Sequence, residues 1–240
     1  MAANAQRTRM RGRFHDLPGV REMAAGCSLI VIHNVLPADE LKRYMESAVH
    51  VPRTSTASAF GHMKPRREIC YRTANDPIFY GYSGKKHPTV LYLPHVQRVV
   101  DILYASVAAY VPDNEFSVQS LGVDIVYDAQ FTRGGSIGAH ADDEMDWDLV
   151  IIFSLGQERV LRVRERSNGE YTNVPLRHNS IVAMHGADFQ RLFTHQVDKL
   201  PVGAAVSERY SLNVRYLRRP PAAPVPAAAA DSVISAPSSN

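Results

Sequence analysis

Short stretches in which apolar and polar residues alternate fill the second half of the chain. A period of two places the apolar side chains on one face of a β-strand, and the Gly, Asn and Pro residues between the stretches are typical of turns. We therefore predict strands at residues 118–127, 149–155, 160–164, 180–184, 194–197 and 209–217. A series of short strands with such turns favours a β-sandwich or jelly roll.

The first half of the chain adds two helices to this pattern. Residues 37–49 form a predicted helix, because a proline suits its first turn and two acidic residues lie near its N-terminus. Apolar residues recur every three or four positions at 93–110, which predicts an amphipathic helix. A further strand is expected at residues 28–35. The predicted fold class is therefore mainly β, with flanking helices packed against the outside of the sheets.

Length and composition favour a single domain. At 240 residues with 45% hydrophobic content, the chain can bury one substantial core. We assign this domain to residues 28–217. Residues 1–27 are basic and weakly patterned, so we expect a flexible N-terminal segment there. Residues 218–240 form a tail rich in Ala, Pro and Ser, which we expect to be disordered.

Charge and cysteine content narrow the class of protein. The net charge of +3 is mildly basic, but Arg residues cluster at 7–13 and Lys and Arg residues recur at 64–86. A solvated tail is the alternative interpretation of the first cluster. Cys27 and Cys70 give no disulfide framework, and the chain lacks apolar runs of transmembrane length and a secretory signal pattern. We therefore expect an intracellular protein without a membrane partner, and we expect a monomer.

His140 and Asp142 are the most informative residues for chemistry. Residues i and i+2 of an extended strand project from the same face, so this imidazole and this carboxylate can bind one ion together. A third ligand must come from elsewhere in the chain, and His178, His185 and His195 are the candidates. Two imidazoles and one carboxylate on one face of a metal leave the opposite positions open, which is the ligand set of non-haem ferrous oxygenases.

A second candidate cluster lies on the last predicted strand. Arg209, Ser211, Asn213 and Arg215 alternate with apolar residues, so they share one face of that strand. Two guanidiniums on one strand face form a clamp for carboxylates, because their planar N–H donors match carboxylate geometry. The sequence therefore predicts a dicarboxylate co-substrate beside the metal.

The order and spacing of these groups resemble the AlkB family of iron(II)/2-oxoglutarate dioxygenases. The resemblance covers residues 60–217 and includes segments besides the ligands. These segments are Lys64-Pro65-Arg66-Arg67 with Tyr71, Tyr80-Gly81-Tyr82-Ser83-Gly84, Ser136-Ile137-Gly138, Ile152-Phe153-Ser154-Leu155-Gly156, Asn179-Ser180-Ile181-Val182-Ala183-Met184 with Gly186-Ala187 and Gln190, and Arg209 to Arg215. The resemblance implies a double-stranded β-helix, or jelly roll, with the site at one open end of the barrel.

The resemblance also implies roles for particular residues. It assigns Fe(II) to His140, Asp142 and His195, because only His195 has the family's spacing to Arg209. It implies that 2-oxoglutarate is the co-substrate and dioxygen the oxidant. Arg209 would bind the far carboxylate of 2-oxoglutarate, and Arg215 would support both the near carboxylate and Asp142.

Further co-substrate contacts follow from the same resemblance. Tyr127 would lie beside the carboxylate that Arg209 binds. Ser211 would also contact the co-substrate, although it stands where the family has an asparagine. Ile125 replaces a second asparagine of the family, shortly before the metal motif. These two replacements bear on the affinity for 2-oxoglutarate and leave the pair of arginines complete.

The function that the resemblance implies is oxidative demethylation of alkylated bases in DNA or RNA, in which a hydroxylated methyl group leaves as formaldehyde. A base must leave its stack to reach the metal, and aromatic side chains commonly hold it. Tyr71 is the expected stacking residue, and Phe60 is either a wedge in the gap or an ordinary core aromatic. The other expected substrate contacts are Arg66, Tyr82 and Glu144.

Two alternative functions remain open. One keeps the metal and 2-oxoglutarate but hydroxylates a protein side chain or a small molecule, in line with the modest net charge. The other is a nucleic-acid-binding homologue with weakened catalysis. Ile125 and Ser211 favour this second alternative, whereas the complete set of metal ligands and arginines argues against it.

Overall fold

The computed structural model describes residues 10–13, 19–50, 54–57, 63–72, 79–82, 85–110, 121–131, 135–142, 147–186 and 188–218. The strands are β1 (Met10–Arg13), β2 (Gly19–Ala24), β3 (Cys27–His33), β4 (Thr54–Ala57), β5 (Met63–Arg72), β6 (Phe79–Tyr82), β7 (Lys85–Leu91), β8 (Leu121–Phe131), β9 (Ile137–His140), β10 (Trp147–Gly156), β11 (Arg159–Glu165), β12 (Tyr171–Leu176), β13 (Ser180–His185), β14 (Phe193–Val197) and β15 (Arg209–Arg218). The helices are α1 (Ala38–His50), α2 (Pro94–Ala108) and α3 (Phe189–Leu192).

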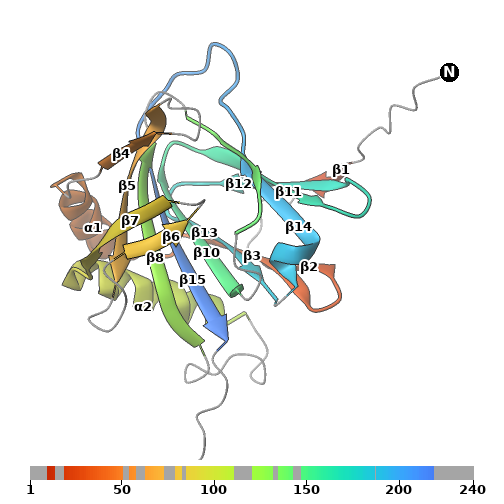
Figure 1. The fold of residues 1–240 in the computed structure, drawn as a ribbon, viewed down its shortest axis with the longest axis horizontal. Helices are drawn as coiled ribbons and strands as arrows, with labels where there is room; N and C mark the ends of the chain where they lie inside the picture. Colours follow the sequence, from red (N-terminus) through yellow and green to blue (C-terminus); the bar gives the residue numbers. More distant parts are fainter. Residues whose placement is uncertain are drawn as a thin grey trace, which may run out of the picture.

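These strands form two sheets. The larger sheet has the order β2-β3-β13-β10-β15-β8-β5-β7-β6, with β4 paired to β5, and the smaller has the order β1-β12-β11-β14-β9. Most neighbouring strands run antiparallel. The chain crosses between the sheets, because β10 and β13 lie in the larger sheet while β11 and β12, which come between them in sequence, lie in the smaller one. Figure 1 shows the smaller sheet on one side of the larger sheet and α1 and α2 on the other. This architecture confirms the predicted mainly β jelly roll with flanking helices.

The larger sheet separates two hydrophobic clusters. In β10, Ile151 and Phe153 pack with α2 in one cluster, whereas Val150 and Ile152 pack with residues of the smaller sheet in the other. Successive side chains of a strand point to opposite faces, so a strand covered on both sides must be apolar at nearly every position. This double burial explains the almost continuous apolar run of β10.

The predicted elements are found with small shifts at their ends, and the structure adds strands that the alternation did not reveal. β12 escaped prediction because Pro175 interrupts its pattern, although the strand pairs with β11 along its length. β2 pairs with β3 in the larger sheet and β1 pairs with β12 in the smaller one, so both sheets include strands that precede residue 28, the predicted start of the domain. The predicted tail lies outside the described residues beyond Arg218. None of the helices in the described part of the chain is both long and apolar enough to cross a membrane.

Gly186 allows a close approach of two loops at the end of β13. Its φ is +114°, and a Cβ atom there would lie 2.1 Å from the backbone oxygen of Gly26. We expect Gly186→Ala to lower the free energy of unfolding by at least about 2 kcal/mol, because the substitution adds both backbone strain and a clash with main chain. Urea denaturation measures this as a lower transition midpoint.

Gly19→Ala is the matched control for this prediction. Gly19 lies on β2, and a Cβ atom at this position would meet nothing within 4 Å. The control should leave the midpoint within the range of an ordinary surface substitution, about 0.5 kcal/mol. Equal midpoints for the two variants would show that the backbones near Gly186 can separate without cost.

Candidate metal centre

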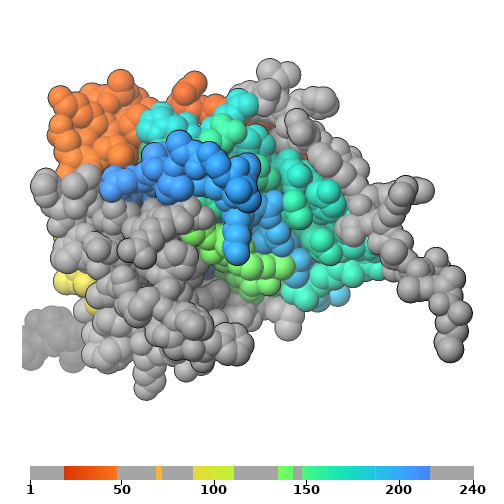
Figure 2. All heavy atoms as spheres, turned by 90° about the horizontal axis from the view of Figure 1, so that it is seen from above, coloured from red at the N-terminus to blue at the C-terminus, as the bar shows by residue number. Residues whose placement is uncertain are grey.

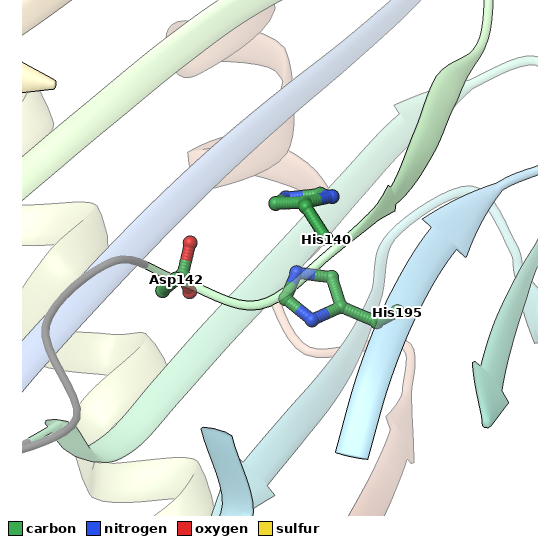
Figure 3. Close-up of side chains that lie close together, drawn as sticks. All are labelled: His140, Asp142 and His195. Atoms are coloured by element: carbon green, nitrogen blue, oxygen red, sulfur yellow. The ribbon is translucent and has the colours of Figure 1, made fainter. Parts of the chain in front are cut away.

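The three predicted metal ligands lie together. β9 and β14 pair antiparallel in the smaller sheet, and the pairing places His140 directly opposite His195. Asp142 follows β9 after one residue and is buried. One ligand atom from each of these three residues can be chosen so that all lie within 4.8 Å of one another. Figure 3 shows the three side chains side by side, at the meeting of β9 and β14.

Local patterning directs these side chains. In β14 the buried residues are Phe193, His195 and Val197, so the imidazole lies on the covered face of the strand. β9 ends at His140, and the sequence prediction of one strand through Asp142 is therefore too long. The chain leaves the ladder after His140, yet Asp142 remains close enough to complete the group.

A hydrogen bond of His140 determines which of its two ring nitrogens faces a metal. Its Nδ1 lies 2.9 Å from the carbonyl oxygen of Gly138, and a carbonyl oxygen only accepts, so Nδ1 carries the proton. Nε2 is the ring nitrogen that remains available to a metal, as in many sites where the second ring nitrogen is held by a carbonyl.

His195 is held in its neutral form. Burial is the main cause that lowers its pKa to about 3, and the nearby His140 acts in the same direction, while Asp142 opposes the shift. Because this pKa lies well below neutral pH, His195 is an uncharged imidazole there, the form that binds metals. Its ring centroid lies 4.3 Å from that of His140. Within the described part of the chain its buried Nδ1 has no hydrogen-bond partner.

Asp142 is prepared as an anionic ligand. Burial alone would raise the pKa of its carboxyl group, but the charge and the hydrogen bond of Arg215 oppose burial, and the pKa lies below its usual range. Arg215 Nη2 donates to Asp142 Oδ1 at 2.8 Å, and both side chains are largely buried. Asp142 Oδ2 is buried without a hydrogen-bond partner among the described residues. The carboxylate therefore keeps one oxygen free for a cation, and the group fits a divalent metal of the kind that two imidazoles and a carboxylate bind.

The rival histidines do not join this group. His178 Nδ1 accepts the backbone N–H of Gly156 at 2.9 Å in a turn beside β13. His185 is buried at the end of β13, where the ladders of the larger sheet place it opposite Leu149 and Ser28. Neither belongs to the group of close ligand atoms found in the described ranges.

The arginine face of β15 is present as the alternation predicts. Tyr210, Leu212 and Val214 pack in the cluster beneath the helices, which leaves the opposite face to Arg209, Ser211 and the rest of the polar set. Arg209 and Ser211 are buried. Arg209 Nη2 donates to the hydroxyl of Ser154 at 3.1 Å. The guanidinium therefore stands in the interior, where a carboxylate has few competing water molecules.

A further arginine, Arg159, adds positive charge near Arg209. Burial, and then the charge of Arg159, lower the pKa of Arg209 to about 9. Arg159 comes from β11 and donates from Nη2 to the carbonyl oxygens of Gly135 and Asp198. These two carbonyls lie before β9 and after β14, so Arg159 ties together the strands of the metal ligands. Arg159 was not among the predicted site residues, and Ser154 was named only within a segment of the family resemblance, because no local pattern marks the role of either residue.

The other predicted co-substrate contact, Tyr127, lies in β8. The ladder between β8 and β15 places Tyr127 opposite Asn213 and Ile125 opposite Arg215. These pairings place the backbone of both residues beside the arginine strand, and the structure describes only the backbone of β8.

The structure contradicts the stacking role predicted for Tyr71. Its side chain is 1% exposed and packs in the core beneath the helices, with its ring stacked on that of Tyr92 at 5.9 Å. The physical reason is register: Tyr71 pairs with Val126, which pairs with Val214, a residue of the same core cluster. Opposite residues of a ladder share a face, so Tyr71 faces away from the arginine side of the sheet.

The remaining predicted substrate contacts cannot be placed as side chains. Phe60 and Glu144 lie outside the described residues. Arg66 and Tyr82 belong to β5 and β6 of the larger sheet, where the backbone alone is described.

Figure 2 shows, on one face of the molecule, the exposed segment 201–208 in blue near the green atoms of residues 135–142. The segment that carries two of the ligands therefore reaches the surface on this face.

Comparison with known proteins agrees with this site. Residues 28–215 match the family model described as the 2OG-Fe(II) oxygenase superfamily. The chain belongs to this superfamily. It is an Fe(II)- and 2-oxoglutarate-dependent dioxygenase, with Fe(II), 2-oxoglutarate and dioxygen as the cofactor and co-substrates of the family. No curated protein matches the sequence.

Among the solved structures that share the fold, two illustrate the similarity. One is an oxidoreductase of the 2OG-Fe(II) oxygenase family from Burkholderia pseudomallei, 16% identical with a TM-score of 0.56, with 81% of this chain and 86% of that chain covered. The other is OsALKBH1, an AlkB homologue, 16% identical with a TM-score of 0.57, with 81% of this chain and 100% of that chain covered. At this identity the two structures support the jelly-roll fold.

Proposed function

We propose that the protein is an AlkB-type oxidative demethylase that removes alkyl groups from bases in DNA or RNA. The observation that carries the proposal is the joint placement of the metal group and the arginine face, in which Arg215 binds Asp142 while Arg209 lies buried on the same face of β15. This placement agrees with the order of motifs that resembles the AlkB family. The likeness of the fold to OsALKBH1 supports the same choice.

In this proposal the residues of the chain have distinct tasks. His140 Nε2, Asp142 Oδ2 and His195 would hold Fe(II), and Arg209 would bind the far carboxylate of 2-oxoglutarate. Bound iron and 2-oxoglutarate supply the oxidation, in which dioxygen converts 2-oxoglutarate to succinate and carbon dioxide and hydroxylates a C–H bond of the substrate.

The protein contributes orientation and a dry environment to this chemistry. Arg215 keeps the Asp142 carboxylate ionised and sets its orientation. Oδ1 accepts the hydrogen bond from Arg215, and Oδ2 has no hydrogen-bond partner among the described residues. Burial keeps His195 neutral, so no proton competes with a cation for the imidazole. Because these groups are arranged before a ligand arrives, little reorganisation is needed on binding.

Mass spectrometry of modified oligomers tests the proposal. Short DNA and RNA strands that carry 1-methyladenine, 3-methylcytosine or 6-methyladenine are incubated with the protein, Fe(II), 2-oxoglutarate and air. We expect at least one strand to lose the mass of one methylene group, and we expect no loss with Asp142→Ala. If every strand keeps its mass while 2-oxoglutarate is still consumed, the nucleic-acid substrate is wrong and the dioxygenase assignment stands.

The burial of Tyr71 favours a second candidate function, the hydroxylation of a protein side chain or a small molecule. The ring of Tyr71, the residue expected to stack on a flipped base, lies in the core beneath the helices and faces away from the metal side of the sheet. The net charge of +3 also adds little general attraction for a polyanion. This candidate predicts turnover of 2-oxoglutarate that no methylated oligomer stimulates.

A further inference from the structure

Gln190 is a buried side chain between the two segments that carry the metal ligands. It lies on α3, the helical turn that leads directly into β14 and His195. Its side chain is 2% exposed, and its Oε1 accepts the backbone N–H of Asp142 at 3.0 Å. This hydrogen bond joins residues that are far apart in sequence, and it links the segments of two predicted ligands.

The hydrogen bond occurs where the strand ladder stops. β9 pairs with β14 as far as His140 and His195, and Asp142 lies beyond the end of β9. A buried backbone N–H outside a ladder still requires an acceptor, because leaving it unpaired costs about as much as a lost hydrogen bond. The Gln190 amide supplies this acceptor, so a side chain continues the connection that the ladder no longer provides.

The amide nitrogen of Gln190 indicates that a ligand binds beside it. A backbone N–H only donates, so the atom that contacts Asp142 is the amide oxygen, and Nε2 is the other atom. Nε2 is buried and has no hydrogen-bond partner in the part of the chain that the structure describes. Buried amide donors are rarely left unsatisfied in folded proteins. An oxygen atom that enters with the metal, from water or from a carboxylate, would satisfy this donor.

We propose that Gln190 is a positioning residue of the metal centre. It fixes the backbone of Asp142, while Arg215 fixes the carboxylate through Oδ1, so the remaining oxygen Oδ2 is held toward the ion from both ends of the residue. This role rests on the ligand set proposed above and is independent of the substrate. Gln190 therefore controls how tightly the protein binds the metal rather than what the enzyme oxidises.

Metal titration and amide exchange test this role together. Gln190→Met keeps a side chain of similar length but replaces the amide oxygen by a thioether, a much weaker acceptor. We expect its affinity for Mn(II), an oxygen-stable probe, to fall about 10- to 100-fold, as for other residues that orient metal ligands. The Asp142 amide, followed by hydrogen exchange in the metal-free protein, should lose its protection. Gln190→Glu keeps an acceptor oxygen, so it should retain that protection. A protected Asp142 amide in Gln190→Met would overturn the role.

A matched control separates this effect from general damage. Gln196 lies in β14 next to His195, and its amide donates to the Asp198 carboxylate, so Gln196→Met removes a comparable group without touching Asp142. We expect this variant to bind Mn(II) as the unaltered protein does. If Asp142→Ala loses Mn(II) while Gln190→Met binds it normally, the inference on Gln190 fails alone. If Asp142→Ala binds Mn(II) normally, the ligand set itself is wrong.

Discussion

Replacing His140, Asp142 or His195 by Ala is expected to reduce iron binding and 2-oxoglutarate consumption to background. Each substitution removes one of three protein ligands, and the two that remain hold a divalent ion much less tightly. The expected loss of metal affinity is at least about 100-fold, because even residues that only orient a ligand cost 10- to 100-fold. Equilibrium competition with a chelator measures the affinity, and succinate release measures turnover.

His185→Ala is the control for this experiment. His185 is also a buried histidine at the end of a strand, and it lies outside the group of close ligand atoms. We expect the variant to bind iron normally once its folding is verified by circular dichroism. An active His195→Ala variant beside an iron-free His185→Ala variant would show that the third ligand is His185.

Arg209→Lys is expected to raise the Michaelis constant for 2-oxoglutarate by roughly 10- to 150-fold while the affinity for iron changes little. Lysine keeps the charge but loses the planar fork that matches a carboxylate, and one charge-assisted hydrogen bond is worth about 1.5–3 kcal/mol. The burial of Arg209 makes this loss larger than at a surface site, because no water replaces the missing donor. Steady-state kinetics over a range of 2-oxoglutarate concentrations measure it.

Arg162→Lys is the matched control for the arginine clamp. Arg162 lies in β11, pairs with Asp198 at 2.8 Å and is partly exposed, so the same change there should leave the Michaelis constant unaltered. An unaltered constant in Arg209→Lys as well would move the carboxylate site away from β15.

The face on which each residue of a strand lies was predictable from sequence. The alternation in β15 separates the arginine face from Tyr210, Leu212 and Val214, and the structure has the same division. The i, i+2 spacing likewise brought His140 and Asp142 to one site, although Asp142 lies just past the strand end. In β15 the local backbone period determines the direction of the side chains, so no tertiary information is required. Asp142 lies past the end of β9, where its long-range contacts with Gln190 and Arg215 hold it in place.

The register between strands, which decides which residues lie opposite one another, was not predictable from the local sequence pattern. The third ligand joins the site through the register of β9 and β14, and sequence spacing alone left three histidines open until the family resemblance favoured His195. Tyr71 was assigned to the wrong face for the same reason, since a shift of one residue in register exchanges the two faces of a strand. Gln190 and Arg159 act through long-range hydrogen bonds to backbone, for which the sequence carries no periodic signal.

Anaerobic titration of the metal-free protein with Fe(II) and then 2-oxoglutarate tests the central claim most directly, because the chelate of the keto acid on iron gives a visible absorption band. We expect the band to grow to saturation at one equivalent of iron in the unaltered protein. In Asp142→Ala the band should be absent, and in Arg209→Lys it should require more 2-oxoglutarate. A band of full intensity in Asp142→Ala, or none in the unaltered protein, would contradict the assignment of His140, Asp142 and His195 as the iron site.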